Sequence, residues 1–297
     1  MRAWRLLPST EALHATGRWC LRTFFACAFV LGVLGSIQVR DSVQSDDRFF
    51  LESWRLELGD LPAWVTPDIR AELEGLRLVG MGERLSLFSP GVLGRITQGL
   101  ERVQWIKAVA DVSVKYPTFE KPGVLGLELH LRRPVALFEQ GGLFYLADAE
   151  GMRLGAPYIE APTEWFQVPV ITGVALPGVL PEPGARWASR DALQGIEVAK
   201  VLMENGIQHD FPGSPIQAID LTNLHGRVSS QDSEIVLLSS RQRLAWGRSP
   251  ISSSARTATV PQLVANLRYV LSNPQAFSHL ALIHLHRKPE ALTGVRG

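Results

Sequence analysis

The sequence has 297 residues and a net charge of +1, and 46% of its residues are hydrophobic. A chain of this length accommodates about two domains, and its apolar content suffices for a packed core in each. Proteins that bind nucleic acids need a strongly basic surface to neutralise phosphates. The nearly neutral charge therefore argues against nucleic acid as a partner.

The N-terminal part predicts a single membrane span. Residues 23–39 contain no charged side chain, and their number is close to the ~20 residues that cross a bilayer core. Basic residues are retained on the cytoplasmic side of a membrane, and several precede this run, with Arg18 and Arg22 closest to it. Mainly acidic residues follow. We therefore expect residues 1–22 to form a cytoplasmic tail, with the bulk of the chain beyond the cytoplasmic (inner) membrane.

A cleaved signal peptide is the alternative, because a basic residue before a short apolar run also fits that pattern. Its cleavage site needs small residues, and Val33, Leu34 and Gly35 supply only a poor one. The polar leader is also long for a signal peptide. A retained span is the better prediction.

Both cysteines, Cys20 and Cys27, belong to this N-terminal segment. The sequence after residue 39 therefore contains neither a disulfide nor a thiol nucleophile, and it must be stabilised by packing alone. Apolar packing within the helix is the simplest role for the two cysteines.

Residues 40–52 are polar and predict a short tether, and the pattern of a small α+β unit follows over residues 53–136. Two helices and three strands are expected in it. In chain order they are a strand from Trp54, a helix starting at Pro67, a helix over residues 92–103, a strand through Val112 and Val114, and a strand over residues 125–131.

The last of these strands has the clearest alternation, with leucines at positions 125, 127, 129 and 131 on one face and Glu128 and His130 on the other. It runs into Arg132, Arg133 and Pro134. Proline cannot donate to a sheet, so Pro134 should mark an edge or the seam between two units. We expect a second unit to begin there almost without a linker.

Residues 137–297 predict a β-rich domain, and the whole chain an α+β fold. One helix should run from a Ser189 cap to Gly206, and another should contain Leu263 to Leu271 and end before Asn273. The expected strands of this part, the first starting just before it, cover residues 135–138, 143–147, 168–171, 216–221, 235–238, 243–246 and 280–285.

The sequence after residue 39 contains no motif of a nucleophilic, phosphate-binding or metal-dependent enzyme. The nearest candidates for metal ligands are His279, His284 and His286, but no third ligand accompanies the last two. The simpler interpretation places these two on the solvent face of a strand whose other face, with Ala281, Ile283 and Leu285, is buried. The acidic residues of the segment 148–151 are those of a turn. We expect no catalytic residue, cofactor or metal.

Several motifs, in this order and spacing, make the chain similar to the FtsQ/DivIB family of bacterial cell-division proteins. They extend over most of the sequence after the span. The motifs are Trp105-Ile106-Lys107-Ala108-Val109, Arg133-Pro134-Val135-Ala136, Leu146-Ala147-Asp148-Ala149-Glu150-Gly151, Val168-Pro169-Val170-Ile171-Thr172-Gly173 and Leu244-Ala245-Trp246-Gly247-Arg248.

The resemblance implies a POTRA domain over residues 53–136, a β domain over residues 137–297, and no catalytic activity. It implies a scaffold of the divisome at the septum, which binds single-span partners of the FtsB and FtsL type. Through them it would recruit or regulate the septal peptidoglycan synthase complex.

The family binds such partners by β-augmentation, in which a partner strand is added to an exposed sheet edge. In this sequence the corresponding edge is residues 290–295, with two basic residues beside it. The residues that the resemblance assigns to partner binding are Arg287, Lys288, Glu290, Ala291, Leu292, Thr293, Gly294 and Val295.

Two other functions remain open at this point. The chain could be a general envelope module of the POTRA type that binds or chaperones exported strands, or, with less support, a metal-dependent hydrolase that uses the histidines.

Overall fold

The computed structural model describes residues 10–51, 54–76, 86–118, 120–162, 167–174, 180–212, 215–248, 258–287 and 294–296. The chain divides into two compact units. The first unit comprises Met1–Glu57, Leu76–Ile96 and Ser113–Gly126, and the second comprises Leu58–Gly75, Thr97–Val112 and Leu127–Gly297. The boundaries expected from the sequence, at residues 53, 137 and 297, stay a prediction.

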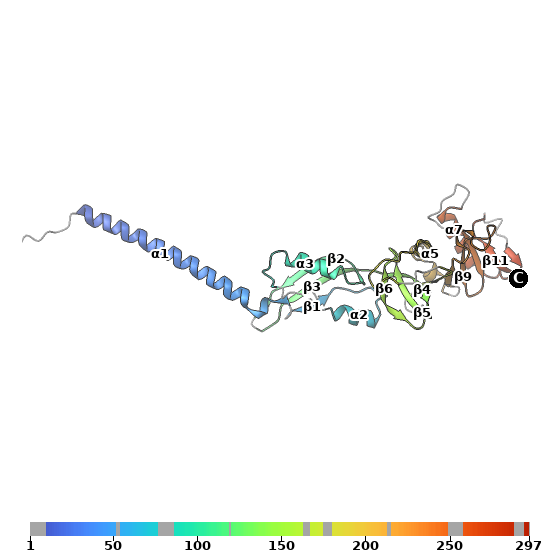
Figure 1. Cartoon of the computed structure of the whole chain (residues 1–297), viewed down its shortest axis with the longest axis horizontal. Helices are drawn as coiled ribbons and strands as arrows, with labels where there is room; N and C mark the ends of the chain where they lie inside the picture. The colour runs from blue at the N-terminus through green and yellow to red at the C-terminus, as the bar shows by residue number, and fades with distance from the viewer. Residues whose placement is uncertain are drawn as a thin grey trace, which may run out of the picture. The chain divides into compact units, whose positions relative to one another are not determined.

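The N-terminal helix α1 (Thr10–Ser45) is long and apolar enough, over Phe24–Ser45, to cross a membrane (Figure 1). It extends beyond the expected span of residues 23–39 at both ends, because helical hydrogen bonds form within the backbone whatever the polarity of the side chains. The segment expected to be a tether therefore continues α1 as far as Ser45. It then forms the short helix η1 (Asp47–Phe49), and Leu51 after it is buried.

The strands β1 (Arg55–Leu58), β3 (Val124–Leu131) and β2 (Ile106–Lys115) form a three-stranded sheet in that order. The two expected helices are present as α2 (Pro67–Glu74) and α3 (Val92–Leu100). Thr66 caps α2 by accepting a hydrogen bond from the Ile69 N–H, and Pro67 occupies the first turn. The alternation predicted for β3 is confirmed: Leu125 and Leu127 are buried, whereas Glu128 and His130 are exposed.

The second unit contains a nine-stranded sheet in the order β12-β11-β10-β9-β8-β7-β4-β5-β6. Its parallel pairs are β4 with β7, β7 with β8, and β10 with β11. Its strands are β4 (Pro134–Gln140), β5 (Leu143–Asp148), β6 (Arg153–Tyr158), β7 (Val170–Thr172), β8 (Ile216–Asp220), β9 (Ile235–Ser239), β10 (Arg243–Gly247), β11 (Leu280–His284) and β12 (Gly294–Arg296).

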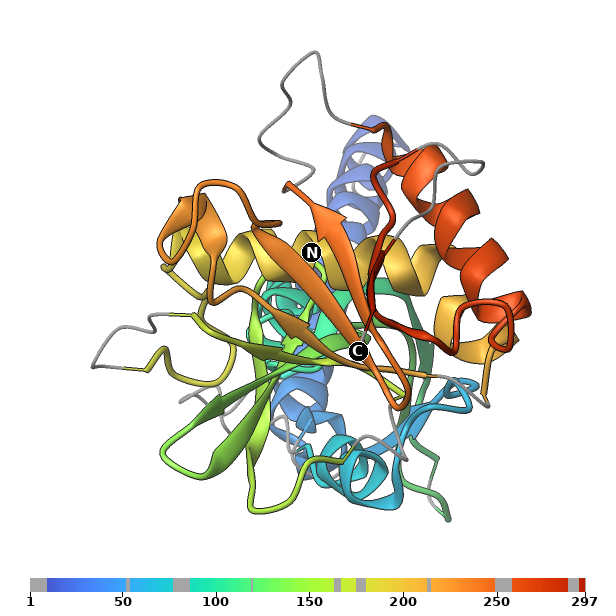
Figure 2. The same ribbon diagram turned by 90° about the vertical axis from the view of Figure 1, so that its right-hand side faces the viewer.

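Two helices connect parallel strands and supply much of the core. Helix α5 (Arg190–Glu204) lies between β7 and β8 in the chain, and α7 (Val260–Ser272) lies between β10 and β11. Figure 2 shows α5 in yellow crossing behind the orange strands, with α7 in red-orange beside them. Ser189 caps α5 as predicted, and a short helix, α6 (Ile207–Asp210), follows Gly206. The mixed α+β class is confirmed.

Strand β6 is the element that the sequence did not predict, because Gly155 and Pro157 both weaken a strand pattern. Gly155 adopts φ +65°, and a Cβ atom there would lie 2.9 Å from the Trp105 ring. The backbone N–H of Gly155 donates to Gln104 Oε1 at 3.0 Å. Contact with residues distant in sequence therefore determines this strand.

Trp105, the first residue of one of the family motifs, is buried and joins α2 to β6. Its Nε1 donates to Glu72 Oε2 at 2.9 Å, and the neighbouring Gln104 donates its amide to Glu72 Oε1 at 2.7 Å. Glu72 of α2 thus accepts from both residues, and the six-membered ring of Trp105 lies against Gly155 of β6.

The Arg132-Arg133-Pro134 segment begins the nine-stranded sheet. Pro134 is the first residue of β4, a position where its missing N–H does not interrupt the pairing. Arg132 Nη1 donates to Asp148 Oδ2 and to Glu150 Oε2, both at 2.8 Å. Asp148 is almost fully buried, and its Oδ1 accepts from the backbone N–H groups of Glu150 and Met152. The turn predicted at residues 148–151 is therefore present, and it is fixed by Arg132.

Glu150 also forms an ion pair with Lys107 of β2. This contact, together with the charge of Arg132, holds the pKa of the Glu150 carboxyl below its usual range, against the opposing effect of partial burial. The turn between β5 and β6 thus receives two basic side chains from the segments before β4.

Substitution of Arg132 by Met tests this network. Removal of the guanidinium leaves the buried Asp148 carboxylate without its ionic partner, so we expect a loss of about 3 kcal/mol in the free energy of unfolding, measured by chemical denaturation. Arg133→Met is the matched control, since Arg133 is exposed and has no hydrogen-bond or ion-pair partner among the described residues. It should change stability by less than about 0.5 kcal/mol. An equal loss in the free energy of unfolding for the two substitutions would contradict the role of Arg132 as the ionic partner of Asp148.

Candidate partner-binding edge

The two ends of the nine-stranded sheet differ in what lies beside them. At one end, the outer side of β6 is covered at its first residue: the Arg153 N–H donates to Ala185 O at 2.9 Å, and the Gly184 N–H donates to Arg153 O at 2.8 Å. At the other end, β12 is the last strand, and no strand of the described part of the chain pairs with its outer side. Within the described residues, β12 is therefore the end of the sheet that no further strand covers.

Strand β12 is held by antiparallel pairing with β11, in which Leu282 lies opposite Val295 and Ile283 lies opposite Gly294. A bulge interrupts this register between Leu280 and Leu282. On its other side β11 pairs in parallel with β10. Strand β12 is thus the edge strand of the hydrogen-bonded sheet among the described residues. The main-chain N–H and C=O groups on the outer side of an edge strand can pair with a further strand.

Helix α7 supports β11 from one face. Its buried side chains Leu263, Leu267 and Val270 belong to the same core as Ile283 and Leu285. Thr259 caps this helix through a capping box with Gln262, and a proline occupies its first turn. Strand β11, which pairs with β12, therefore packs on α7, a helix whose first residue is determined by the local capping sequence.

A buried amide fixes the direction in which the chain leaves β11. Asn266 of α7 is only 4% exposed, and its Nδ2 donates to both Leu285 O and Arg287 O at 2.7 Å. The Leu285 N–H donates to Ala245 O of β10 at 2.9 Å. Both carbonyl groups would lack these partners without the amide, so Asn266 positions the turn that leads towards β12.

The residues assigned to partner binding fall into three groups in the structure. Gly294 and Val295 lie on β12, at the edge. Arg287 is exposed in the turn after β11. The other five lie outside the described residues, namely Lys288, Glu290, Ala291, Leu292 and Thr293.

The histidines lie beside this edge. His284 ends β11 and His286 follows in the turn, with a distance of 5.3 Å between the ring centroids. Burial lowers the pKa of both imidazoles, and the charge of Arg287 lowers it further. Both rings are therefore neutral at pH 7, and Arg287 carries the positive charge of this turn. No group of three His, Cys, Asp or Glu side chains that could hold a metal occurs among the described residues.

One expectation about β11 is wrong. Ala281 was expected on the buried face with Ile283 and Leu285, but it is exposed, and Leu280 is buried in its place. The bulge between Leu280 and Leu282 explains the difference, because an extra residue breaks the alternation of faces.

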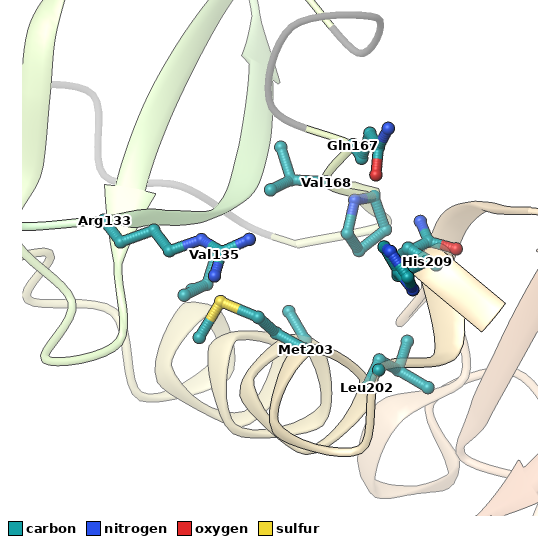
Figure 3. A pocket seen from close by; sticks show the side chains of 11 residues that line it. Arg133, Val135, Gln167, Val168, Leu202, Met203 and His209 are labelled. Atoms are coloured by element: carbon teal, nitrogen blue, oxygen red, sulfur yellow. The ribbon is translucent and has the colours of Figure 1, made fainter. Parts of the chain in front are cut away.

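A small hollow lies elsewhere in the second unit. It has a volume of about 50 Å³, and Figure 3 shows Arg133 reaching it from the segment before β4, and Leu202 and Met203 from α5. A wider hollow of about 570 Å³ shares Gln167, Val168 and Gln208 with it. Arg133 and the exposed His209 are the ionisable side chains that line them. This set offers no pair of groups for acid–base or nucleophilic chemistry.

The sequence analysis missed Asn266, although a signal was present. Asn266 stands within the apolar pattern of α7, between Val264 and Leu267, where an apolar residue is expected. A polar residue at a core position needs a hydrogen-bond partner, and here the partners are the two carbonyls after β11.

No protein-family model matches the chain, and no curated protein matches it.

Asn266→Ala should weaken the support of this edge. We expect the free energy of unfolding to fall by about 2 kcal/mol, because the buried Leu285 carbonyl and the partly buried Arg287 carbonyl lose their partner. Amide hydrogen exchange should also increase in β11 and in the turn at Leu285 more than in β4 or β5. Gln231→Ala removes an exposed amide with no side-chain partner among the described residues and should change neither quantity. If Asn266→Ala increased amide exchange no more in β11 than in β4 and β5, Asn266 would have no specific role in supporting the edge.

Proposed function

We propose that the chain is a membrane-anchored, non-catalytic scaffold that binds another single-span envelope protein by adding a strand of that protein to β12. In this proposal the partners are of the FtsB and FtsL type, and the scaffold helps to recruit or regulate septal peptidoglycan synthesis. The proposal joins the motif resemblance to the FtsQ/DivIB family with one observation, the open edge at β12.

The edge is suited to such a partner for a physical reason. Main-chain hydrogen bonds from an added strand supply affinity whatever its sequence, and flanking side chains then select the partner. Arg287 lies in the turn beside the edge, and it would favour a partner with acidic residues next to its strand. The covered outer side of β6 supports β12 rather than β6 as the binding edge.

The helix α1 supports the anchoring part of the proposal. Its window Phe24–Ser45 has the length and apolar character of a membrane span, and none of its residues is buried within the protein. With the N-terminus in the cytoplasm, the part of the chain that follows α1 would lie outside the cytoplasmic membrane.

Localisation in dividing cells tests the division role. A fluorescent protein fused to the N-terminus, on the cytoplasmic side in this topology, should form a band at the constriction site. A fusion to a variant truncated after Leu51 keeps the helix and removes the folded units, and it should be distributed evenly. An even peripheral signal from the intact chain would instead favour a general envelope module and would remove the division role.

A proline substitution tests the mode of binding. Thr293→Pro removes a backbone N–H from the segment 290–295 that the resemblance assigns to strand addition, so co-purification with the FtsB- or FtsL-type protein of the same cells should be lost. The thermal unfolding of the full chain should remain unchanged. Ile159→Pro is the matched control, because Ile159 is 81% exposed and directly follows β6 at the opposite end of the sheet. Retained binding by a folded Thr293→Pro variant would exclude β-augmentation at this edge.

A further inference from the structure

A small cleft lies in the first unit, next to the end of α1. It has a volume of about 250 Å³ and is formed by η1 and by the connection between β2 and β3. Its lining residues are Asp47, Arg48, Pro117, Thr118, Glu120, Lys121 and Pro122. Neither the motifs nor the proposed partner edge accounts for it.

The two walls of the cleft are joined through Trp54. The indole Nε1 of Trp54 donates to Arg48 O at 2.9 Å. The ring lies on Gly123, where a Cβ atom would be 2.3 Å from it, and the Arg55 N–H donates to Gly123 O at 3.0 Å. Since Trp54 is only 8% exposed, the cleft has a fixed shape.

The position of the cleft relative to a bilayer follows from the helix. The uncharged run ends at Val39, and residues 40–45 continue α1 for about 9 Å at 1.5 Å per residue. The headgroup layer on each side of a bilayer is roughly 5–8 Å thick. If α1 spans the membrane, η1 therefore lies at the outer border of the headgroups.

Aromatic side chains near the cleft agree with this depth. Phe88 is 42% exposed and packs on Phe49 of η1, with 5.1 Å between ring centroids. Tyr116, next to Pro117 of the cleft, is 66% exposed. Aromatic residues are enriched at the interface between membrane and water, where an exposed ring contacts headgroups instead of water alone.

The charges of the cleft are of both signs. Arg48 is engaged by Asp46, whose carboxylate accepts from its Nε and Nη2, and this contact lowers the pKa of Asp46 to about 2. The Glu120 carboxylate and the Lys121 ammonium, in contrast, have no hydrogen-bond or ion-pair partner among the described residues. An adjacent anion and cation are therefore available at the opening.

Thr118 adds a hydroxyl donor. Its Oγ1 accepts from the backbone N–H groups of Glu120 at 3.3 Å and Lys121 at 3.1 Å. Its own hydrogen has no acceptor among the described residues, so it can be donated to a ligand.

We propose that this cleft binds the phosphoethanolamine headgroup of a membrane phospholipid. Lys121 and the Thr118 hydroxyl contact the phosphate, and Glu120 accepts hydrogen bonds from the primary ammonium. A choline headgroup has no N–H to donate, so the site discriminates against it. This inference depends on the membrane anchoring in the proposed function, and it does not depend on the partner edge.

Lipid binding to the full chain tests the proposal. The chain is transferred from detergent to the gas phase with added phosphatidylethanolamine or phosphatidylcholine, and bound lipid is counted by native mass spectrometry. We expect the wild-type chain to prefer phosphatidylethanolamine by about tenfold, and Glu120→Gln to abolish this preference, because the ammonium loses its carboxylate acceptor. Lys121→Glu should weaken the binding of both lipids, since both carry the phosphate. Arg133→Glu is the matched control, an equal change of charge at an exposed arginine of the second unit, and should keep the preference.

Two outcomes would overturn the proposal. Equal binding of both lipids by the wild-type chain would show that the cleft does not recognise the ammonium. Binding of soluble phosphoethanolamine as tightly as the lipid would assign the site to a soluble phosphoester instead. Co-purification with the partner is measured on the same Lys121→Glu protein to separate the two proposals. Loss of lipid binding in the cleft should leave partner binding at β12 intact.

Discussion

The second unit depends on one buried carboxylate, that of Asp148. Three donors surround it: the Arg132 guanidinium and the backbone N–H groups of Glu150 and Met152. A buried carboxylate is tolerated only when its charge is compensated, so the end of β3, the start of β4 and the turn between β5 and β6 are constrained together. The segment around Pro134 is in this way tied by hydrogen bonds to the turn between β5 and β6, and the nine-stranded sheet starts from it.

From that junction the sheet extends through β7 and β8 to β12, and the helices α5 and α7 cover the crossings between parallel strands. Parallel strands require such a crossover, and its helix buries the apolar face of the sheet. At the β12 end of the sheet, the Asn266 amide stabilises the turn after β11 by donating to the carbonyls of Leu285 and Arg287. At Arg153 the outer side of β6 is covered by main-chain hydrogen bonds, whereas no strand of the described residues pairs with the outer side of β12.

The first unit combines a membrane-length helix with a small folded part through η1 and Trp54. A cleft lies at the level where headgroups are expected, and its Glu120 and Lys121 side chains have no ionic partner among the described residues. A single membrane span leaves a protein free to rotate about the helix axis. Binding of a lipid headgroup in the cleft, in addition to anchoring by α1, would restrict this rotation. Such a restriction would matter to a scaffold that presents an edge to partners in the same membrane.

Local patterns in the sequence determined the membrane-length helix, the α+β class, the alternation of β3, the caps at Thr66 and Ser189, and most strands of the sheet. These features depend on neighbours a few residues apart, which the sequence shows directly. For the candidate edge, the sequence indicated the C-terminal segment, and Gly294 and Val295 lie on the outermost strand. Tertiary structure alone decided β6, whose glycine fits against Trp105, and the exposure of Ala281, which follows from a bulge. It also decided that, of two adjacent arginines, Arg132 is paired with a buried carboxylate and Arg133 is not. Such contacts join residues far apart in the chain, and no local pattern specifies them.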